Sequence, residues 1–80
     1  MKMIDAIKER LYQLCEENDI TINELATRAG LPPSTVKNIL YGRSVNPGAV
    51  TIKKICDGIN ISIKRFYNCD LFDNLEPEIY

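Results

Sequence analysis

The stretch from residue 21 to residue 42 constrains the fold most, because it carries start and stop signals for two short helices. Thr21, followed three residues later by Glu24, forms a capping box at the start of the first helix. Gly30 can end that helix, because glycine adopts the left-handed conformation at little cost. Pro33 suits the first position of the second helix. The stretch therefore predicts two helices joined by a tight turn, which is a helix-turn-helix.

The second of these helices, expected over 33–41, has two opposed faces at a spacing of about 100° per residue. The apolar face consists of Val36, Ile39 and Leu40. The polar face consists of Ser34, Lys37, Asn38 and Tyr41. Side chains of these types hydrogen-bond to base edges and to phosphates. A helix that is anchored on one side and polar on the other can enter the major groove of DNA.

The flanking sequence predicts three further helices, so we expect an all-α bundle of five. They should cover residues 4–18, about 47–59 and 63–68, with Asn46 as a cap and Pro47 at the first position of the middle one. In the helix over 4–18, Lys, Glu and Arg side chains are expected on the solvent side. The inner faces of the three helices consist of Ile4, Ile7, Leu11, Leu14, Cys15, Ile52, Ile55, Cys56, Ile59, Ile63 and Phe66.

The length of 80 residues leaves room for one core. We expect a single domain over residues 1–68, with the helix-turn-helix at 21–42, followed by a tail or short helix over 69–80. Pro77 prevents a long continuation of any helix there. Apolar side chains near this end either contact a second copy of the chain or close the core. They are Phe66, Leu71, Phe72 and Leu75.

The formal net charge of −1 is low for a nucleic-acid binder, but the charge is unevenly distributed. Residues 37–65 hold six Lys and Arg against one Asp, a local charge of +5. Residues 1–20 carry −2, and residues 66–80 carry −4. The middle of the chain is therefore basic, although solvated charge on helix surfaces would give the same pattern.

The composition argues against an enzyme, a metal site and a membrane protein. The chain has no histidine, which is the commonest general base, and none of the common nucleotide-binding or nucleophile motifs. Its cysteines do not form a C-x-x-C pair, and we expect Cys15 and Cys56 in the core and Cys69 partly exposed. No apolar run approaches the roughly 20 residues that span a bilayer, and the N-terminus lacks a signal peptide. We expect a cytoplasmic protein without a cofactor.

Taken together, these residues resemble the phage repressor and Cro type of helix-turn-helix, often called the xenobiotic-response-element (XRE) family. The resemblance rests on residues 21–30, 34–42, 46–47 and 51–62, and it covers most of the chain. It implies a compact five-helix, lambda-repressor-like domain that binds double-stranded DNA, commonly as a homodimer. It also implies a bacterial or phage transcriptional regulator, and we expect a repressor.

The resemblance also implies which residues contact DNA. Its base-reading positions fall on Pro33, Ser34, Lys37 and Asn38. Its phosphate-holding positions fall around Asn23, at the start of the helix after Thr21, and in the loop from Arg43 to Pro47, which includes Asn46. To these we add Thr35 and Tyr41, whose hydroxyl groups can hold a phosphate. The alternatives are that Ser34 and Thr35 cap the helix, and that Tyr41 packs its ring against the loop.

The sequence departs from the family pattern at two places. The family commonly has a glutamine where Ile22 stands, and isoleucine cannot hydrogen-bond a phosphate. The family also favours polar residues where Pro32 and Pro33 stand, and proline has neither an N–H nor a polar side chain. Ile22 and the acidic tail leave a second hypothesis open, in which the fold binds a protein partner as an antidote or anti-repressor.

Overall fold

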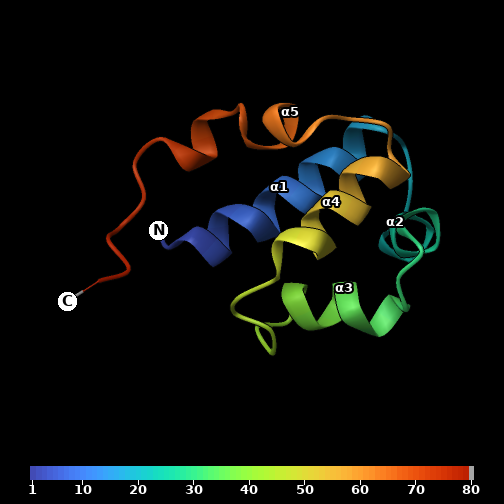
Figure 1. Cartoon of the computed structure of the whole chain (residues 1–80), viewed down its shortest axis with the longest axis horizontal. Helices are drawn as coiled ribbons and strands as arrows, with labels where there is room; N and C mark the ends of the chain where they lie inside the picture. The colour runs from blue at the N-terminus through green and yellow to red at the C-terminus, as the bar shows by residue number, and fades with distance from the viewer. Residues whose placement is uncertain (80) are drawn as a thin grey trace.

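The computed structural model describes residues 1–79 as five α-helices and one short 3₁₀ helix (Figure 1). The elements are α1 (Met3–Glu17), α2 (Ile22–Ala29), α3 (Pro33–Leu40), α4 (Ala49–Gly58), α5 (Ile63–Tyr67) and η1 (Asp70–Phe72). Residues 1–79 contain no strand, which confirms the all-α expectation. Tyr80, the last residue of the expected tail, lies outside the described residues. Among the residues described, no helix is both long and apolar enough to cross a membrane.

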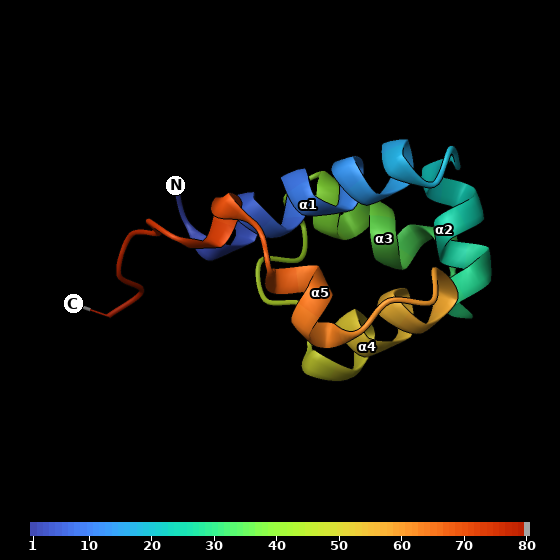
Figure 2. The ribbon, with the colours of Figure 1, turned by 90° about the horizontal axis from the view of Figure 1, so that it is seen from above.

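Helix α2 joins the two sides of the bundle. Seen from above, α1 and α3 lie on one side, α4 and α5 lie on the other, and α2 crosses the end between them (Figure 2). The most extensive helix pairing is that of α2 with α4, and the next is that of α2 with α3. Because α2 packs on both neighbours, it fixes where α3 sits relative to the rest of the molecule.

The core is built from the inner faces that the sequence predicts. The side chains that are fully buried include Leu11, Leu14, Leu25, Val36, Ile39, Ile55, Cys56 and Phe66. Burial raises the pKa of the Cys15 and Cys56 thiols, as expected for cysteines that pack as small apolar residues. The prediction is wrong for Ile63, which is 38% exposed. Ser62 caps α5 directly before Ile63, so the five-residue helix turns Phe66 inward instead.

The start and stop signals that the sequence predicts for α2 are confirmed. The Thr21 hydroxyl accepts a hydrogen bond from the backbone N–H of Glu24 at 3.1 Å, and the Glu24 carboxylate accepts one from the N–H of Thr21 at 3.2 Å. Gly30 ends the helix with φ of +69°, in the left-handed region. The N–H of Leu31 then donates to the carbonyl of Ala26 at 2.9 Å, which closes the turn.

The start of α4 differs from the prediction. The cap is Gly48 rather than Asn46, and the helix begins at Ala49 rather than at Pro47. Gly48 is extended (φ −68°, ψ 158°), and its carbonyl accepts the first helical hydrogen bond, from Ile52 at 3.2 Å. The loop after α3 is therefore two residues longer than predicted, and Asn46 is exposed within it.

Arg10 is the third correction, because the sequence places it on the solvent side of α1. Its side chain is buried, with 6% exposed. The guanidinium donates from Nε to the carbonyl of Phe66 at 2.7 Å and from Nη2 to the carbonyl of Arg65 at 2.8 Å. Arg10 thus binds two of the last carbonyl groups of α5, of which that of Arg65 also accepts from the N–H of Asn68 at 3.3 Å.

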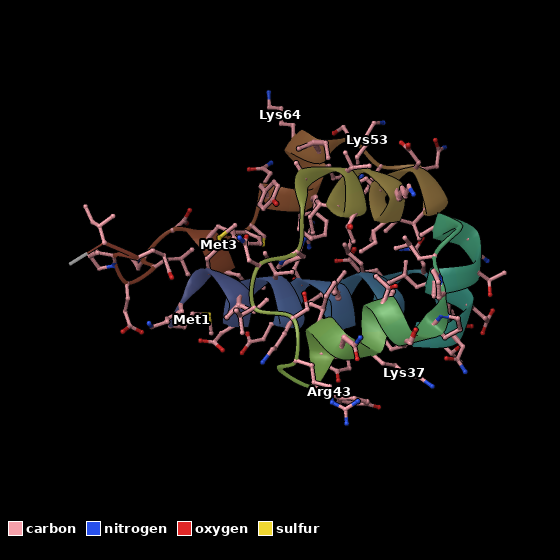
Figure 3. All side chains as sticks on the ribbon, turned by 60° about the horizontal axis from the view of Figure 1, so that its bottom comes forward. Met1, Met3, Lys37, Arg43, Lys53 and Lys64 are labelled. Atoms are coloured by element: carbon pink, nitrogen blue, oxygen red, sulfur yellow. The ribbon has the colours of Figure 1, made fainter. Side chains whose placement is uncertain are left out.

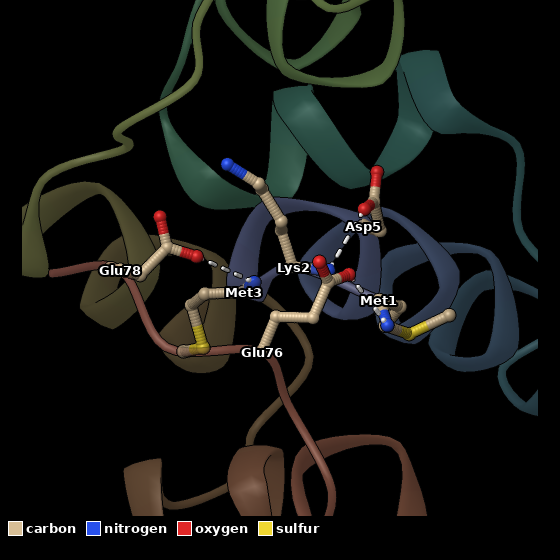
Figure 4. A network of polar contacts seen from close by, with 6 residues as sticks. All are labelled: Met1, Lys2, Met3, Asp5, Glu76 and Glu78. Atoms are coloured by element: carbon tan, nitrogen blue, oxygen red, sulfur yellow. Dashed lines mark hydrogen bonds and ion pairs between the residues drawn. The ribbon is translucent and has the colours of Figure 1, made fainter. Parts of the chain in front are cut away.

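The described part of the tail packs back on the bundle. Phe72 of η1 lies edge-on to the ring of Tyr67, with centroids 4.9 Å apart, and 6.2 Å from that of Phe66. Beyond it, the carboxylates of Glu76 and Glu78 meet the start of the chain (Figure 4). Glu76 pairs with the Met1 amino group at 3.1 Å and donates its own N–H to the Met1 carbonyl at 3.0 Å. Because the ring of Phe72 packs beside that of Phe66, these two residues close the core.

Candidate nucleic-acid interface

Helix α3 shows the two faces that the sequence predicts. Val36, Ile39 and Leu40 are 0%, 1% and 9% exposed, so they anchor the helix. On the opposite side the side chains reach the surface. Pro33, Ser34 and Tyr41 are exposed, and Thr35, Lys37 and Asn38 are half-buried. The helix is therefore held by its buried apolar face and presents hydrogen-bonding groups to solvent on the other.

The start of α3 leaves its hydroxyl groups free. Pro32 occupies the cap position, and its carbonyl accepts from the N–H of Thr35 at 3.0 Å, but no side chain caps the helix. Within residues 1–79, neither the Ser34 nor the Thr35 hydroxyl forms a hydrogen bond. The structure therefore does not show Ser34 or Thr35 as a cap of α3. Both hydroxyl groups remain available to an external ligand.

The turn after α3 is tied to the middle of that helix. Gly42 has φ of +78°, and the next two backbone N–H groups, those of Arg43 and Ser44, both donate to the carbonyl of Asn38 at 2.9 Å. The Asn38 side-chain amide has no hydrogen-bond partner among the described residues. Asn38 thus fixes the turn through its backbone and keeps its amide free. Tyr41 is 65% exposed, so its ring is mostly in solvent rather than packed against the loop.

The two other expected phosphate ligands lie on separate elements. Asn23 is exposed in the first turn of α2, whereas the preceding Ile22 is half-buried against the core. Asn46 is exposed in the loop before α4, where it borders a shallow hollow together with Ile4 of α1 and Glu78 of the tail. The structure therefore joins the α3 residues to Arg43 through the turn, but it shows no contact that links Asn23 or Asn46 to them.

The basic middle of the sequence does not form one surface. Figure 3 shows Lys37 and Arg43 on one side of the molecule and Lys53 and Lys64 on the opposite side. Lys53 also forms an ion pair with Asp57 one helical turn later. Because Lys53 and Lys64 lie on the side opposite to Lys37 and Arg43, the local charge of +5 is divided between two faces. The polar face of α3 therefore carries fewer cations than the sequence suggests.

Comparison with known proteins agrees with this geometry. A family model described as the Cro/C1-type helix-turn-helix DNA-binding domain matches residues 10–71, which include α2, the turn and α3. The chain is 33% identical over 58 residues to the HTH-type transcriptional repressor RghR of Bacillus subtilis (strain 168), a match that covers 72% of this chain and 43% of RghR. It is 26% identical over 73 residues to the uncharacterized HTH-type transcriptional regulator YvzC of the same strain, covering 91% of this chain and 94% of YvzC.

The chain thus spans less than half the length of RghR and nearly all of YvzC. No solved structure matches the chain significantly. The family match covers more than half of the chain and contains the whole recognition unit. The chain therefore belongs to the family of Cro/C1-type helix-turn-helix DNA-binding domains.

Proposed function

We propose that this chain is a sequence-specific transcriptional regulator that places α3 in the major groove of its operator. The observation that carries the proposal is the outward polar face of α3, in which the Asn38 amide has no partner in the described chain. An amide can pair bidentately with N6 and N7 of adenine, which discriminates against other bases by about 1–3 kcal/mol. Lys37 is suited to O6 and N7 of guanine, Ser34 to a hydrogen-bonding base edge, and Pro33 to a thymine methyl group.

Phosphate contacts would hold the helix in register. Arg43 is exposed directly after α3, and Thr35 and Tyr41 carry free hydroxyl groups beside the proposed base readers. Asn23 at the start of α2 and Asn46 in the loop complete the proposed set. Such contacts supply affinity without sequence preference, so they position α3 while the base readers select the site.

The proposed regulator acts as a homodimer and as a repressor. One recognition helix reads only a few base pairs, whereas two copies on half-sites about 34 Å apart would read a site of useful length. One of the similar proteins, RghR, is named a transcriptional repressor. A dimer bound across a promoter would repress by excluding RNA polymerase from it.

The test is selection from a randomised duplex library at about 150 mM salt, where purely electrostatic binding is weak. The expected result is a two-fold symmetric site that is bound by the wild-type chain. Asn38→Ala should relax the preference at one base pair of each half-site, at a cost of about 1–3 kcal/mol, with the other positions unchanged. Asn74→Ala, an exposed asparagine in the tail, is the matched control and should change nothing.

An unchanged preference in Asn38→Ala would refute the assigned role of Asn38. Failure of the folded wild-type chain to enrich any duplex would refute the proposed function. The second hypothesis, a protein-binding module, would then be favoured. The division of lysines between two faces supports that hypothesis, because it leaves few cations beside α3.

A further inference from the structure

A lysine from outside the helix-turn-helix lies at the turn that ends α3. Gly42 has no side chain, and a Cβ placed on it would lie 3.7 Å from Nζ of Lys8, in the second turn of α1. The Lys8 ammonium group therefore sits against the same turn that Asn38 fixes through its carbonyl and from which Arg43 extends. The geometry points to a phosphate-binding site formed by Lys8 and Arg43 across Gly42.

The backbone of α1 at Lys8 is held in place by its packing. Ile7 and Leu11, which flank Lys8 on the helix, are 4% and 0% exposed, so this part of α1 cannot rotate. The Lys8 side chain is itself half-buried, and α1 packs against α3. A lysine whose stem is confined in this way loses less side-chain entropy on binding an anion than a fully solvated lysine does.

The charge of Lys8 has no partner in the part of the chain that the structure describes. The ion pairs among residues 1–79 are those of Met1 with Glu76 and of Lys53 with Asp57, and no hydrogen bond is donated by Lys8. An ammonium group has three N–H donors and no acceptor. Lys8 therefore presents an unpaired positive charge at the turn, beside a glycine that lets an anion approach the backbone closely.

The position of the turn indicates that this anion is a phosphate of the DNA backbone. The inference rests on the proposed function, in which α3 lies in the major groove, and the turn directly after α3 then faces one of the strands that border the groove. Lys37 and Arg43 mark this side of the molecule, whereas Lys53 and Lys64 lie on the opposite side (Figure 3). Lys8 adds a third cation to a face that otherwise carries few.

The experiment measures how binding depends on salt for Lys8→Gln, which removes the charge and keeps most of the stem. The probe is a fluorescein-labelled 30-base-pair duplex of mixed sequence, titrated at salt concentrations from about 50 to 200 mM. Each phosphate contact contributes about 0.9 to the slope of log K against log salt. The ratio of wild-type to Lys8→Gln affinity should therefore fall about 3.5-fold over this fourfold range of salt.

Two further variants separate a phosphate contact from other effects. Lys64→Gln removes an exposed lysine from the opposite face and should keep the wild-type slope. Lys8→Arg keeps the charge and should also keep most of the slope. This expectation does not depend on whether Lys8→Gln lowers the melting temperature. The contact is supported when Lys8→Gln alone has the smaller slope.

The alternative role for Lys8 is to stabilise the carbonyl end of α3 by its charge. Lys8→Gln would then melt at a lower temperature but bind DNA with the wild-type slope, and this result would overturn the inference while leaving the proposed function intact. A folded wild-type chain that binds this duplex at no salt concentration and enriches no duplex from the randomised library would overturn both.

Discussion

Gly58, the last residue of α4, should not tolerate a methyl group, because α4 approaches α2 there at backbone distance. A Cβ on Gly58 would lie 2.8 Å from the backbone N of Ala29 and 2.8 Å from the carbonyl C of Arg28. Ordinary contacts between such atoms are about 3.5–4.0 Å. Both neighbours are backbone atoms, so no change of side-chain rotamer can relieve the contact. Gly58→Ala would have to move α2 and α4 apart by nearly 1 Å.

The expected change in the unfolding free energy of Gly58→Ala is the difference between two opposing effects. Overpacking of a tight contact costs about 1–3 kcal/mol. Replacing glycine by alanine inside a helix regains about 0.5–1 kcal/mol of backbone entropy. Because the pairing of α2 with α4 is the most extensive in the bundle, we expect the overpacking cost to dominate. The net loss should be about 1–2 kcal/mol, which for a domain of this size lowers the melting temperature by about 4–16 °C.

The assay is thermal unfolding followed by circular dichroism, with the wild-type chain and Gly48→Ala measured alongside. Gly48 is the matched control, because a Cβ there meets no atom within 4 Å and its φ of −68° suits any residue. We expect Gly48→Ala to change the unfolding free energy by no more than about 1 kcal/mol. A melting temperature for Gly58→Ala equal to or above that of the wild type would show that helix propensity outweighs the close approach, and the reasoning would be wrong.

Two further predictions concern the buried arginine and the start of α2. Arg10→Ala should lower the unfolding free energy by about 2–4 kcal/mol, since it removes two charge-assisted hydrogen bonds and leaves the carbonyls of Arg65 and Phe66 without that donor. Denaturant unfolding measures this loss, and an effect below 1 kcal/mol would mean that water replaces the guanidinium. Ile22→Gln should tighten binding to the mixed-sequence duplex about 10-fold, by adding a donor beside Asn23 that can reach a phosphate. Unchanged affinity in the same fluorescence titration would show that this end of α2 does not contact the backbone of DNA.

The parts of the fold that could be predicted are those set by neighbouring residues in the sequence. The capping box of Thr21 and Glu24 and the left-handed Gly30 both depend on hydrogen bonds within four residues, and each appears where the sequence indicates. The apolar spacing of α3 likewise predicts which side is buried. Such signals are local, so they do not require knowledge of how the helices pack.

The parts that could not be predicted depend on contacts between distant residues. Arg10 looks like a solvent-facing residue of an amphipathic helix until α5 places the carbonyls of Arg65 and Phe66 beside it. The pair Asn46 and Pro47 fits a helix start in sequence, but the carbonyl of Asn38 binds the turn after α3 and the chain then needs two more residues before Gly48 can cap α4. For Arg10 the deciding hydrogen bonds span more than 50 residues. For the start of α4 they lie within the turn itself, beyond the reach of the simple cap pattern.

The same distinction applies to the charge of the candidate interface. Counting along the sequence gives a basic segment of +5, but helix orientation sends Lys53 and Lys64 away from α3 and brings Lys8 toward its end. What binds DNA is the set of cations that touch phosphates, so an overall charge of −1 does not oppose binding.

If Lys8 and Arg43 each neutralised one phosphate, one copy of the chain would have a salt slope of about −1.8. A slope of that size corresponds to weak binding at physiological salt, and the polar contacts of α3 add only a few base pairs of preference. One copy would then lack both the affinity and the reading length that a regulator needs. Two copies would double both, since each brings its own cations and its own α3. If the chain binds DNA with so few cations on the α3 side, it therefore needs two copies on one site.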